Sequence, residues 1–269
     1  MNKKRIISIL MIFVLFIIVI YLSSIDIIKN KVSETSASLT NNKKIGWGIK
    51  REENHIQPDL GSSNRKVLEE NNGIAIGNKE KKYIYLTFDE GYEAGYTEKI
   101  LDTLKQNQVP ATFFITAHYV NTQEDLVKRM IDEGHIVGNH TVNHKSMPDL
   151  TEEQIRKEVM ELHQVIQKIF SYEMKYIRPP KGEFSERTLK YTNSLGYKTV
   201  MWSFAYEDWN EDKQPEEQAS KEKILKNLHN GEIMLLHGNS NTNTNILESV
   251  IKETKNMGFE FKSLDEFEK

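Results

Sequence analysis

The chain has 269 residues, which is enough for one large domain or two small ones. Its formal net charge of −3 leaves no broad basic field, so nucleic acid is excluded as a partner. The count of cysteines is 0. Disulfides and thiolate metal sites are therefore excluded, and any transition metal must be held by histidine and carboxylate side chains.

Residues 1–24 carry the pattern of an export signal. A basic cap, Asn2 to Arg5, precedes an apolar run from Ile6 to Leu22 that is broken only by Ser8 and Tyr21. The run exceeds the ~7–15 apolar residues of a cleaved signal peptide and reaches the lower limit of ~17–25 for a membrane span. Because the basic end stays in the cytoplasm, we expect export to the cell-wall side. An uncleaved anchor in the cytoplasmic membrane, a cleaved signal peptide and a buried soluble helix remain open.

The next two segments precede the main domain. Residues 25–45 are rich in Ser, Thr, Asn and Lys, which predicts a polar linker. Residues 46–80 place isolated apolar anchors such as Trp47 and Leu60 among turn residues. This pattern predicts an irregular lead-in that packs on a main domain of residues 81–269.

From residue 82 onward, strand-like apolar runs alternate with amphipathic helical stretches. The runs that predict strands are 83–88, 111–117, 135–139, 175–178, 197–204, 231–236 and 259–262. The stretches that predict helices are 94–107, 122–133, 151–170, 185–195, 216–229 and 243–257. Thr151 and Gln154 fit a capping box at the start of one helix. The alternation predicts an α/β fold with about seven parallel strands, in a sheet that is open or closed into a barrel.

Acids and histidines follow two of these strands. Asp89 and Glu90 end the first strand, and we expect a turn there to bring both carboxylates into one cavity. His140 and His144 are four residues apart, which places both imidazoles on one face of a helical turn. This pairing predicts a metal-assisted hydrolase in which one acid binds the metal and the other handles protons. The alternative is a polar loop at each strand end.

Four other histidines are predicted to be incidental surface residues. They are His118, His135, His163 and His229.

Three further motifs lie at later strand ends, where barrel enzymes build their active sites. The two prolines of Arg178–Gly182 fix an extended turn and leave the Lys181 N–H free to point at a ligand. Arg178 can pair with a carboxylate and lower its pKa, although a rigid loop with a surface arginine is the alternative. Asp208 and His237 suit a general acid pair in which the aspartate holds the histidine protonated.

Taken in order, these motifs resemble the five motifs of the polysaccharide deacetylases, the NodB-homology group or carbohydrate esterase family 4. The segments that carry the resemblance are Thr87–Gly91, His140–His144, Arg178–Gly182, Asp208–Trp209 and Leu235–His237. The resemblance covers about residues 80–269. Further segments are similar to the sporulation branch of the family, which acts on N-acetylmuramic acid in spore cortex peptidoglycan. These segments are Trp47–Lys50, Gly91–Thr97 and Phe261–Glu266.

The resemblance implies a distorted (β/α) barrel of about seven parallel strands that holds a divalent metal ion, with zinc first and cobalt, manganese or magnesium as alternatives. His140 and His144 would be metal ligands, and Asp89 the general base. Glu90 stands where the family usually has a second aspartate ligand. It would bind the metal directly, bind it through water, or leave the metal to the two histidines.

The resemblance also implies roles around the substrate. Arg178 would orient Asp89, and the Lys181 N–H would help to hold the oxyanion. His237 would be the general acid, supported by Asp208. Further substrate contacts would come from two aromatic residues, Trp209 and Tyr92, of which Trp209 would form part of an apolar wall.

The implied function is removal of N-acetyl groups from peptidoglycan amino sugars, with N-acetylmuramic acid favoured, on the route to muramic δ-lactam in spore cortex. The alternatives are a deacetylase for N-acetylglucosamine or chitooligosaccharides, an O-acetyl esterase, and a non-catalytic cell-wall-binding protein with a degraded site. The expected partners are peptidoglycan glycan strands and, through the N-terminal segment, the cytoplasmic membrane. We expect a monomer.

Overall fold

The computed structural model describes Tyr21 and residues 42–269. Within this part, residues 44–269 form one compact unit. Apart from Tyr21, the predicted export segment 1–24 lies outside the described residues, as does most of the predicted linker 25–45. Among the residues that are described, no helix has the length and apolar character needed to cross a membrane.

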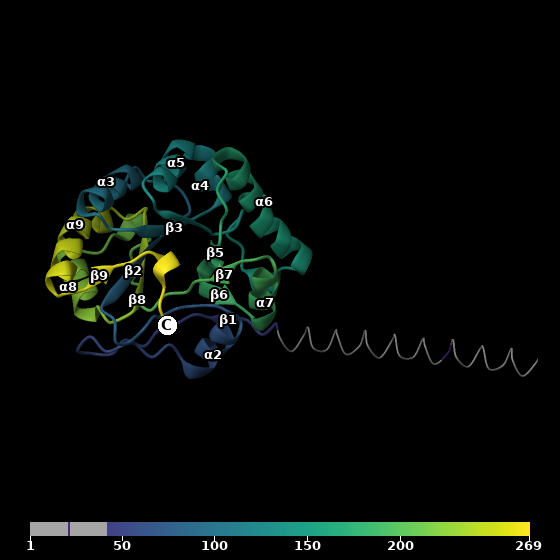
Figure 1. Cartoon of the computed structure of the whole chain (residues 1–269), viewed down its shortest axis with the longest axis horizontal. Coiled ribbons are helices and arrows are strands. Elements are labelled where there is room, and N and C mark those ends of the chain that lie inside the picture. Colours follow the sequence, from purple (N-terminus) through teal and green to yellow (C-terminus); the bar gives the residue numbers. More distant parts are fainter. Residues whose placement is uncertain (1–20, 22–41) are drawn as a thin grey trace, which may run out of the picture. The chain divides into compact units, whose positions relative to one another are not determined.

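A seven-stranded sheet forms the centre of this unit (Figure 1). Its strands are β2 (Tyr83–Glu90), β3 (Ala111–Ile115), β4 (Ile136–Asn139), β5 (Tyr176–Ile177), β7 (Lys198–Thr199), β8 (Glu232–His237) and β9 (Glu260–Phe261). Their order is β7-β5-β4-β3-β2-β8, with β9 also paired to β2, and every pairing is parallel. The predicted α/β fold with about seven parallel strands is therefore confirmed.

The sheet curls, and its two ends meet without a regular ladder. Past β7 the chain forms an isolated parallel bridge between Phe204 and Met234 of β8. The Ser203 N–H donates to the Ile233 carbonyl at 3.0 Å, next to this bridge. The barrel is distorted because these few contacts, rather than a full strand pair, join β7 to β8.

Helices surround the curled sheet (Figure 1). They are α3 (Thr97–Asn107), α4 (Ala117–Thr122), α5 (Glu124–Asp132), α6 (Glu152–Phe170), α7 (Glu186–Ser194), α8 (Glu217–Asn227) and α9 (Asn241–Asn256). Short 3₁₀ helices are η1 (Met147–Asp149), η2 (Pro180–Gly182), η3 (Glu211–Lys213) and η4 (Leu264–Glu266). The stretch 122–133, predicted as one helix, is α5 alone, and α4 precedes it with Gln123 between them. The predicted capping box at the start of α6 is present.

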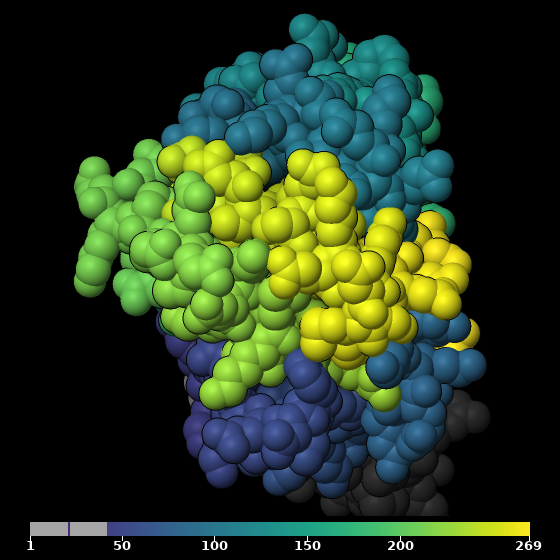
Figure 2. All heavy atoms as spheres, turned by 90° about the vertical axis from the view of Figure 1, so that its left-hand side faces the viewer, coloured from purple at the N-terminus to yellow at the C-terminus, as the bar shows by residue number. Residues whose placement is uncertain are grey.

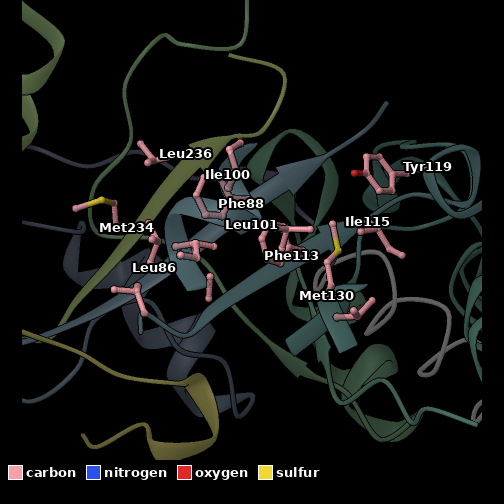
Figure 3. Packing of buried hydrophobic residues seen from close by; sticks show 14 of the residues in the cluster. Leu86, Phe88, Ile100, Leu101, Phe113, Ile115, Tyr119, Met130, Met234 and Leu236 are labelled. Atoms are coloured by element: carbon pink, nitrogen blue, oxygen red, sulfur yellow. The ribbon is translucent and has the colours of Figure 1, made fainter. Parts of the chain in front are cut away.

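The main hydrophobic core lies between the sheet and its helices. Figure 3 shows Leu86 and Phe88 of β2 packed among Ile100, Leu101 and other apolar side chains. The ring of Phe88 stacks on that of Phe113, with centroids 5.2 Å apart. Successive residues of a strand point to opposite faces, so the even-numbered residues of β2 face the helices and the odd-numbered residues face the barrel interior. This alternation decides where the two acids at the end of β2 point.

The region 46–80, predicted to be irregular, contains a helix, α2 (Ser62–Glu70). Its only buried residue is Leu68, so the helical period of apolar residues is weak there. Just before this region, β1 (Ile45–Gly46) pairs antiparallel with β6 (Glu183–Phe184). The Trp47 Nε1–H donates to the Trp202 carbonyl at 2.9 Å. In Figure 2 this N-terminal part of the unit (purple) lies below the C-terminal part (green and yellow).

Candidate active site

A cavity of about 1090 Å³ opens at the carboxyl ends of the strands. β2, β4 and β8 end beside it, and the loops that follow β4, β5 and β7 complete its wall. It brings together most of the residues predicted for the site: Asp89, Tyr92, His140, His144, Lys181, Trp209 and His237. Other lining residues were missed by the sequence prediction, among them Trp202, Tyr206 and Asn239. No motif marked these three, because they lie beside the motifs and their types are common in cores and turns.

Asp89 ends an interior-facing row of β2 and pairs with a buried arginine. Arg178 Nη1 donates to Asp89 Oδ1 at 2.7 Å, and Arg178 Nη2 donates to Thr87 Oγ1 at 2.9 Å. Burial by itself would raise the pKa of Asp89, but the charges of Arg178 and nearby histidines outweigh it and lower that pKa. Arg178 is fully buried, so a surface arginine is ruled out and the predicted ion pair is present. Asp89 is therefore held as a carboxylate.

His140 and His144 converge, although not on a helical turn as predicted. Their Nε2 atoms lie 3.1 Å apart. The chain between them turns through left-handed residues, Thr141 at φ 70° and His144 at φ 53°. His140 Nδ1–H donates to the Arg178 carbonyl at 2.9 Å, which leaves its Nε2 unprotonated. The four-residue spacing correctly predicted that the two imidazoles are neighbours, but the helical turn that it predicted between them is absent from this described segment.

Both imidazoles are neutral at pH 7. Burial lowers the pKa of His140, with Asp89 acting in the opposite direction. Burial and the neighbouring His140 lower the pKa of His144 to about 4. Neutral imidazole is the form that binds metals. Two imidazole nitrogens at this separation fit one divalent ion such as zinc, although no group of three His, Asp or Glu side chains among the described residues is arranged to hold one.

The structure does not bring Glu90 to this pair, so the prediction that both acids share one cavity is wrong. β2 stays extended through Glu90, and strand alternation therefore turns Glu90 toward the helices while Asp89 faces the interior. Glu90 is 1% exposed, and its Oε1 lies 3.5 Å from Thr97 Oγ1. Its Oε2 has no hydrogen-bond partner among the residues that the structure describes. A Cβ on Gly238 would come within 1.9 Å of Oε1, so the glycine covers the carboxyl closely.

The environment of Glu90 also disfavours a charged carboxylate. Burial raises its pKa well above the ordinary value, and the nearby Glu93 and Asp89 add to the rise. The surroundings therefore favour the ionised form of Asp89 and the protonated, uncharged form of Glu90.

His237 and Asp208 form the expected pair across the cavity. Their Nδ1 and Oδ1 atoms are 2.7 Å apart, and the His237 N–H donates to Asp208 Oδ2 at 3.0 Å. Asn243, which the sequence prediction missed, donates its Nδ2–H to Asp208 Oδ2 at 2.6 Å. Burial would lower the pKa of His237, but the charge of Asp208 outweighs it and raises that pKa. The histidine is thereby biased toward its protonated form.

The backbone at Lys181 and two aromatic rings complete the wall. Lys181 has a φ of 61°, and within the described part of the chain its N–H donates no hydrogen bond. Trp209 is 54% exposed and Tyr92 is 43% exposed. Large exposed rings beside a cavity are typical of ligand-binding surfaces.

The prediction that four other histidines are incidental surface residues is wrong for three of them, whereas His118 is exposed as predicted. His135, His163 and His229 are buried, and His118 lines the cavity. His163 Nδ1 lies 2.6 Å from the Tyr197 hydroxyl, and His229 Nε2 lies 2.8 Å from Ser203 Oγ. Hydrogen bonds of this kind offset the cost of burying an imidazole, and the sequence pattern could not reveal them.

An Asp–Arg ion pair, two converging imidazoles and a hydrogen-bonded His–Asp pair at the carboxyl edge of a (β/α) barrel define the class as a hydrolase. The family model for polysaccharide deacetylase matches residues 76–200. The peptidoglycan-N-acetylmuramic acid deacetylase PdaA of Bacillus subtilis is 44% identical over 231 residues, which cover 85% of this chain and 88% of that protein. Its solved structure, that of a family 4 carbohydrate esterase, matches with a TM-score of 0.82 at 43% identity, over 84% of this chain and 97% of that one.

A peptidoglycan-N-acetylglucosamine deacetylase of Bacillus cereus is 32% identical over 192 residues, which cover 70% of this chain and 69% of that protein. The chain belongs to the polysaccharide deacetylase family. The resemblance found in the five motifs is thus confirmed.

Proposed function

We propose that this polysaccharide deacetylase removes the N-acetyl group from N-acetylmuramic acid in peptidoglycan. The observation that carries the proposal is the placement of Asp89, whose pKa is lowered, and His237, whose pKa is raised, at one cavity beside the histidine pair. The similarity to a relative named for this substrate supports the choice of sugar. Formation of muramic δ-lactam in spore cortex remains an expectation from the sporulation-branch motifs.

His140 and His144 would hold a divalent ion, which when bound polarises the acetamide carbonyl and acidifies water. Zinc suits imidazole ligands best, and cobalt, manganese and magnesium are the alternatives. Glu90 is left out of this ligand set because it faces the helix layer.

Asp89 acts as the general base. It removes a proton from the water that attacks the acetamide carbon, and Arg178 keeps it ionised and fixed for that task. The Lys181 N–H is free to donate to the carbonyl oxygen as that oxygen becomes negative. A donor of this kind stabilises the transition state by about 3–4 kcal/mol.

His237 acts as the general acid. Asp208 keeps it protonated, so it can donate a proton from Nε2 to the departing nitrogen as the C–N bond breaks. The products are acetate and a free amine on the sugar. Trp209 and Tyr92 offer exposed rings on which the sugar can rest.

A deacetylase for N-acetylglucosamine is the second candidate, because a Bacillus cereus relative at 32% identity is named for that substrate. Incubation with defined muropeptides and with acetyl-chitooligomers, followed by mass spectrometry, separates the two readings. We expect acetate release from muramic residues. Free amines on glucosamine residues alone would favour the second candidate, and loss of O-acetyl groups alone would favour an esterase.

A non-catalytic cell-wall-binding protein is the third candidate, because Glu90 stands where the family usually has a second aspartate ligand but faces the helices instead of the cavity. That reading expects binding to glycan strands with no acetate release in the presence of zinc, cobalt, manganese or magnesium. Acetate release with any one of these ions contradicts it.

We also propose that the protein is exported and acts as a monomer on peptidoglycan strands outside the cytoplasmic membrane. The basic cap and apolar run of residues 2–22 support this location. Fractionation of cells that produce the full chain tests whether it stays in the membrane or is released, and size-exclusion chromatography tests the oligomeric state.

A further inference from the structure

A second cavity of about 320 Å³ adjoins the active-site cavity. The two cavities share two wall residues, Tyr92 and Asn239. The other residues of the second cavity are Glu93, Ala94, Tyr96, Glu211, Gln214 and Asn241. A cavity that shares a wall with the catalytic one is placed to hold a sugar that neighbours the reacting sugar on the same glycan strand.

The two cavities differ in charge. Of the described residues, two carboxylates, Glu93 and Glu211, line the second cavity, and no lysine, arginine or histidine does. The catalytic cavity is lined by one carboxylate, Asp89, together with Lys181 and four histidines. An anionic sugar is therefore disfavoured in the second cavity and better tolerated in the catalytic cavity.

The polar groups of the second cavity are held in place. Glu93 Oε1 accepts from the N–H groups of Gly95 and Tyr96, each at 2.6 Å. Glu211 Oε1 accepts from the Tyr92 hydroxyl. Asn239 Nδ2 donates to that same hydroxyl at 2.9 Å. Glu211 therefore places a carboxylate in the second cavity, beside the two residues that both cavities share.

Asn239 leaves one group free for a ligand. Its side-chain amide donates to the Tyr92 hydroxyl and to the Trp209 carbonyl, and the residue is 9% exposed. Its Oδ1 accepts no hydrogen bond from any residue that the structure describes. A sugar hydroxyl or acetamide N–H can donate to this oxygen and to the second oxygen of Glu211. These acceptors suit a neutral sugar that offers donors.

Peptidoglycan strands alternate two sugars of different charge. N-acetylglucosamine is neutral, whereas N-acetylmuramic acid without its stem peptide carries a lactyl carboxylate. We propose that the second cavity binds N-acetylglucosamine and that the charge of Glu211 sets the register of the glycan strand, that is, which of its two sugars lies in which cavity. In the favoured register the muramic sugar enters the catalytic cavity. This inference rests on the proposed function and names the residue that selects between its two sugars.

The size of the effect follows from Coulomb's law. Two unit charges about 7 Å apart, at an effective dielectric constant of about 40 to 80, repel enough to change a binding ratio by about 3- to 8-fold. Salt should weaken this preference, because exposed charges are screened at high ionic strength.

The test uses glycan strands stripped of stem peptides and incubated with the zinc-loaded full chain. Total acetate is measured, and tandem mass spectrometry locates each free amine on a glucosamine or a muramic residue. Glu211→Gln removes the charge while its side-chain oxygen can still accept from Tyr92. Glu211→Asp keeps the charge. Glu80→Gln removes an equal charge from an exposed residue that lines neither cavity.

We expect Glu211→Gln to raise the ratio of glucosamine to muramic product by about 3- to 8-fold, and Glu211→Asp and Glu80→Gln to leave it near the wild-type value. Raising salt from about 0.05 M to about 0.5 M should move the wild-type ratio toward that of Glu211→Gln, and it should change the variant's ratio less, because only the charge of Glu93 then remains in the second cavity. An unchanged ratio in Glu211→Gln overturns the register proposal. Absence of acetate release by the wild type overturns the proposed function itself, and the register proposal with it.

Discussion

Substitution of Glu90 tests whether this residue is excluded from the metal site because its side chain faces the helices. Glu90 faces the helix layer, is 1% exposed and has a pKa raised well above its ordinary value by burial and by the nearby Glu93 and Asp89. Its surroundings therefore favour the uncharged acid over the carboxylate. Glu90→Gln replaces it with an uncharged amide of nearly the same shape, whereas His144→Gln removes one of the two imidazoles that converge at 3.1 Å.

The magnitudes differ between the two variants. Loss of a group that merely supports a metal ligand costs about 10- to 100-fold in affinity, and loss of a ligand itself should exceed that range. We therefore expect His144→Gln to lower zinc affinity by more than about 100-fold and Glu90→Gln to change it by less than about 2-fold. The glutamine brings an extra N–H into a sealed site, where an unpaired donor costs about 1–3 kcal/mol of unfolding free energy.

Calorimetric titration with zinc chloride measures the affinity, and urea unfolding measures the stability. The expected pattern is normal zinc affinity with reduced stability in Glu90→Gln, and the reverse in His144→Gln. Zinc affinity that falls as far in Glu90→Gln as in His144→Gln would refute the reasoning, because it would mean that Glu90 turns into the cavity to bind the ion.

Three further substitutions test other parts of the site. Asp208 raises the pKa of His237, so Asp208→Asn should lower that pKa and move the alkaline limb of the pH profile of kcat to lower pH. An alkaline limb that does not move would contradict the role of His237 as the general acid. Trp209 is 54% exposed, so Trp209→Ala should change the unfolding free energy by no more than about 0.5 kcal/mol while raising KM several-fold. Urea unfolding measures the first effect, and steady-state kinetics measures the second. A Cβ on Gly238 would lie 1.9 Å from Glu90 Oε1, so Gly238→Ala should destabilise the fold by about 1–3 kcal/mol through overpacking, and an unchanged Tm would show that the site can relax.

Most of the barrel could be predicted because its strands are continuous apolar runs separated by amphipathic helices. The elements that the sequence predicted poorly are short or partly exposed. α2 buries only Leu68, so it lacks the periodic apolar face that reveals a helix. β5 and β7 span two residues each, because the irregular bridges near Phe204 replace part of the ladder expected over 197–204.

The site could be predicted in its residues more than in its geometry. Motif spacing brought Asp89, His140 and His237 to one cavity, with Arg178 buried behind Asp89. The orientation of Glu90 depended on how far β2 stays extended, which a single residue decides. The buried histidines were misplaced for a related reason. Their partners, such as Ser203 for His229, lie far away in the sequence.

Acetate release from a defined muropeptide by the zinc-loaded protein, compared with Asp89→Asn, tests the central claim most directly. Asn keeps the shape of Asp89 but cannot accept the proton of the attacking water. The account predicts acetate and a free amine on the muramic sugar with the wild type, and no measurable release with a variant whose circular dichroism and Tm show that it is folded. Release by Asp89→Asn at the wild-type rate would contradict the assignment of Asp89 as the base.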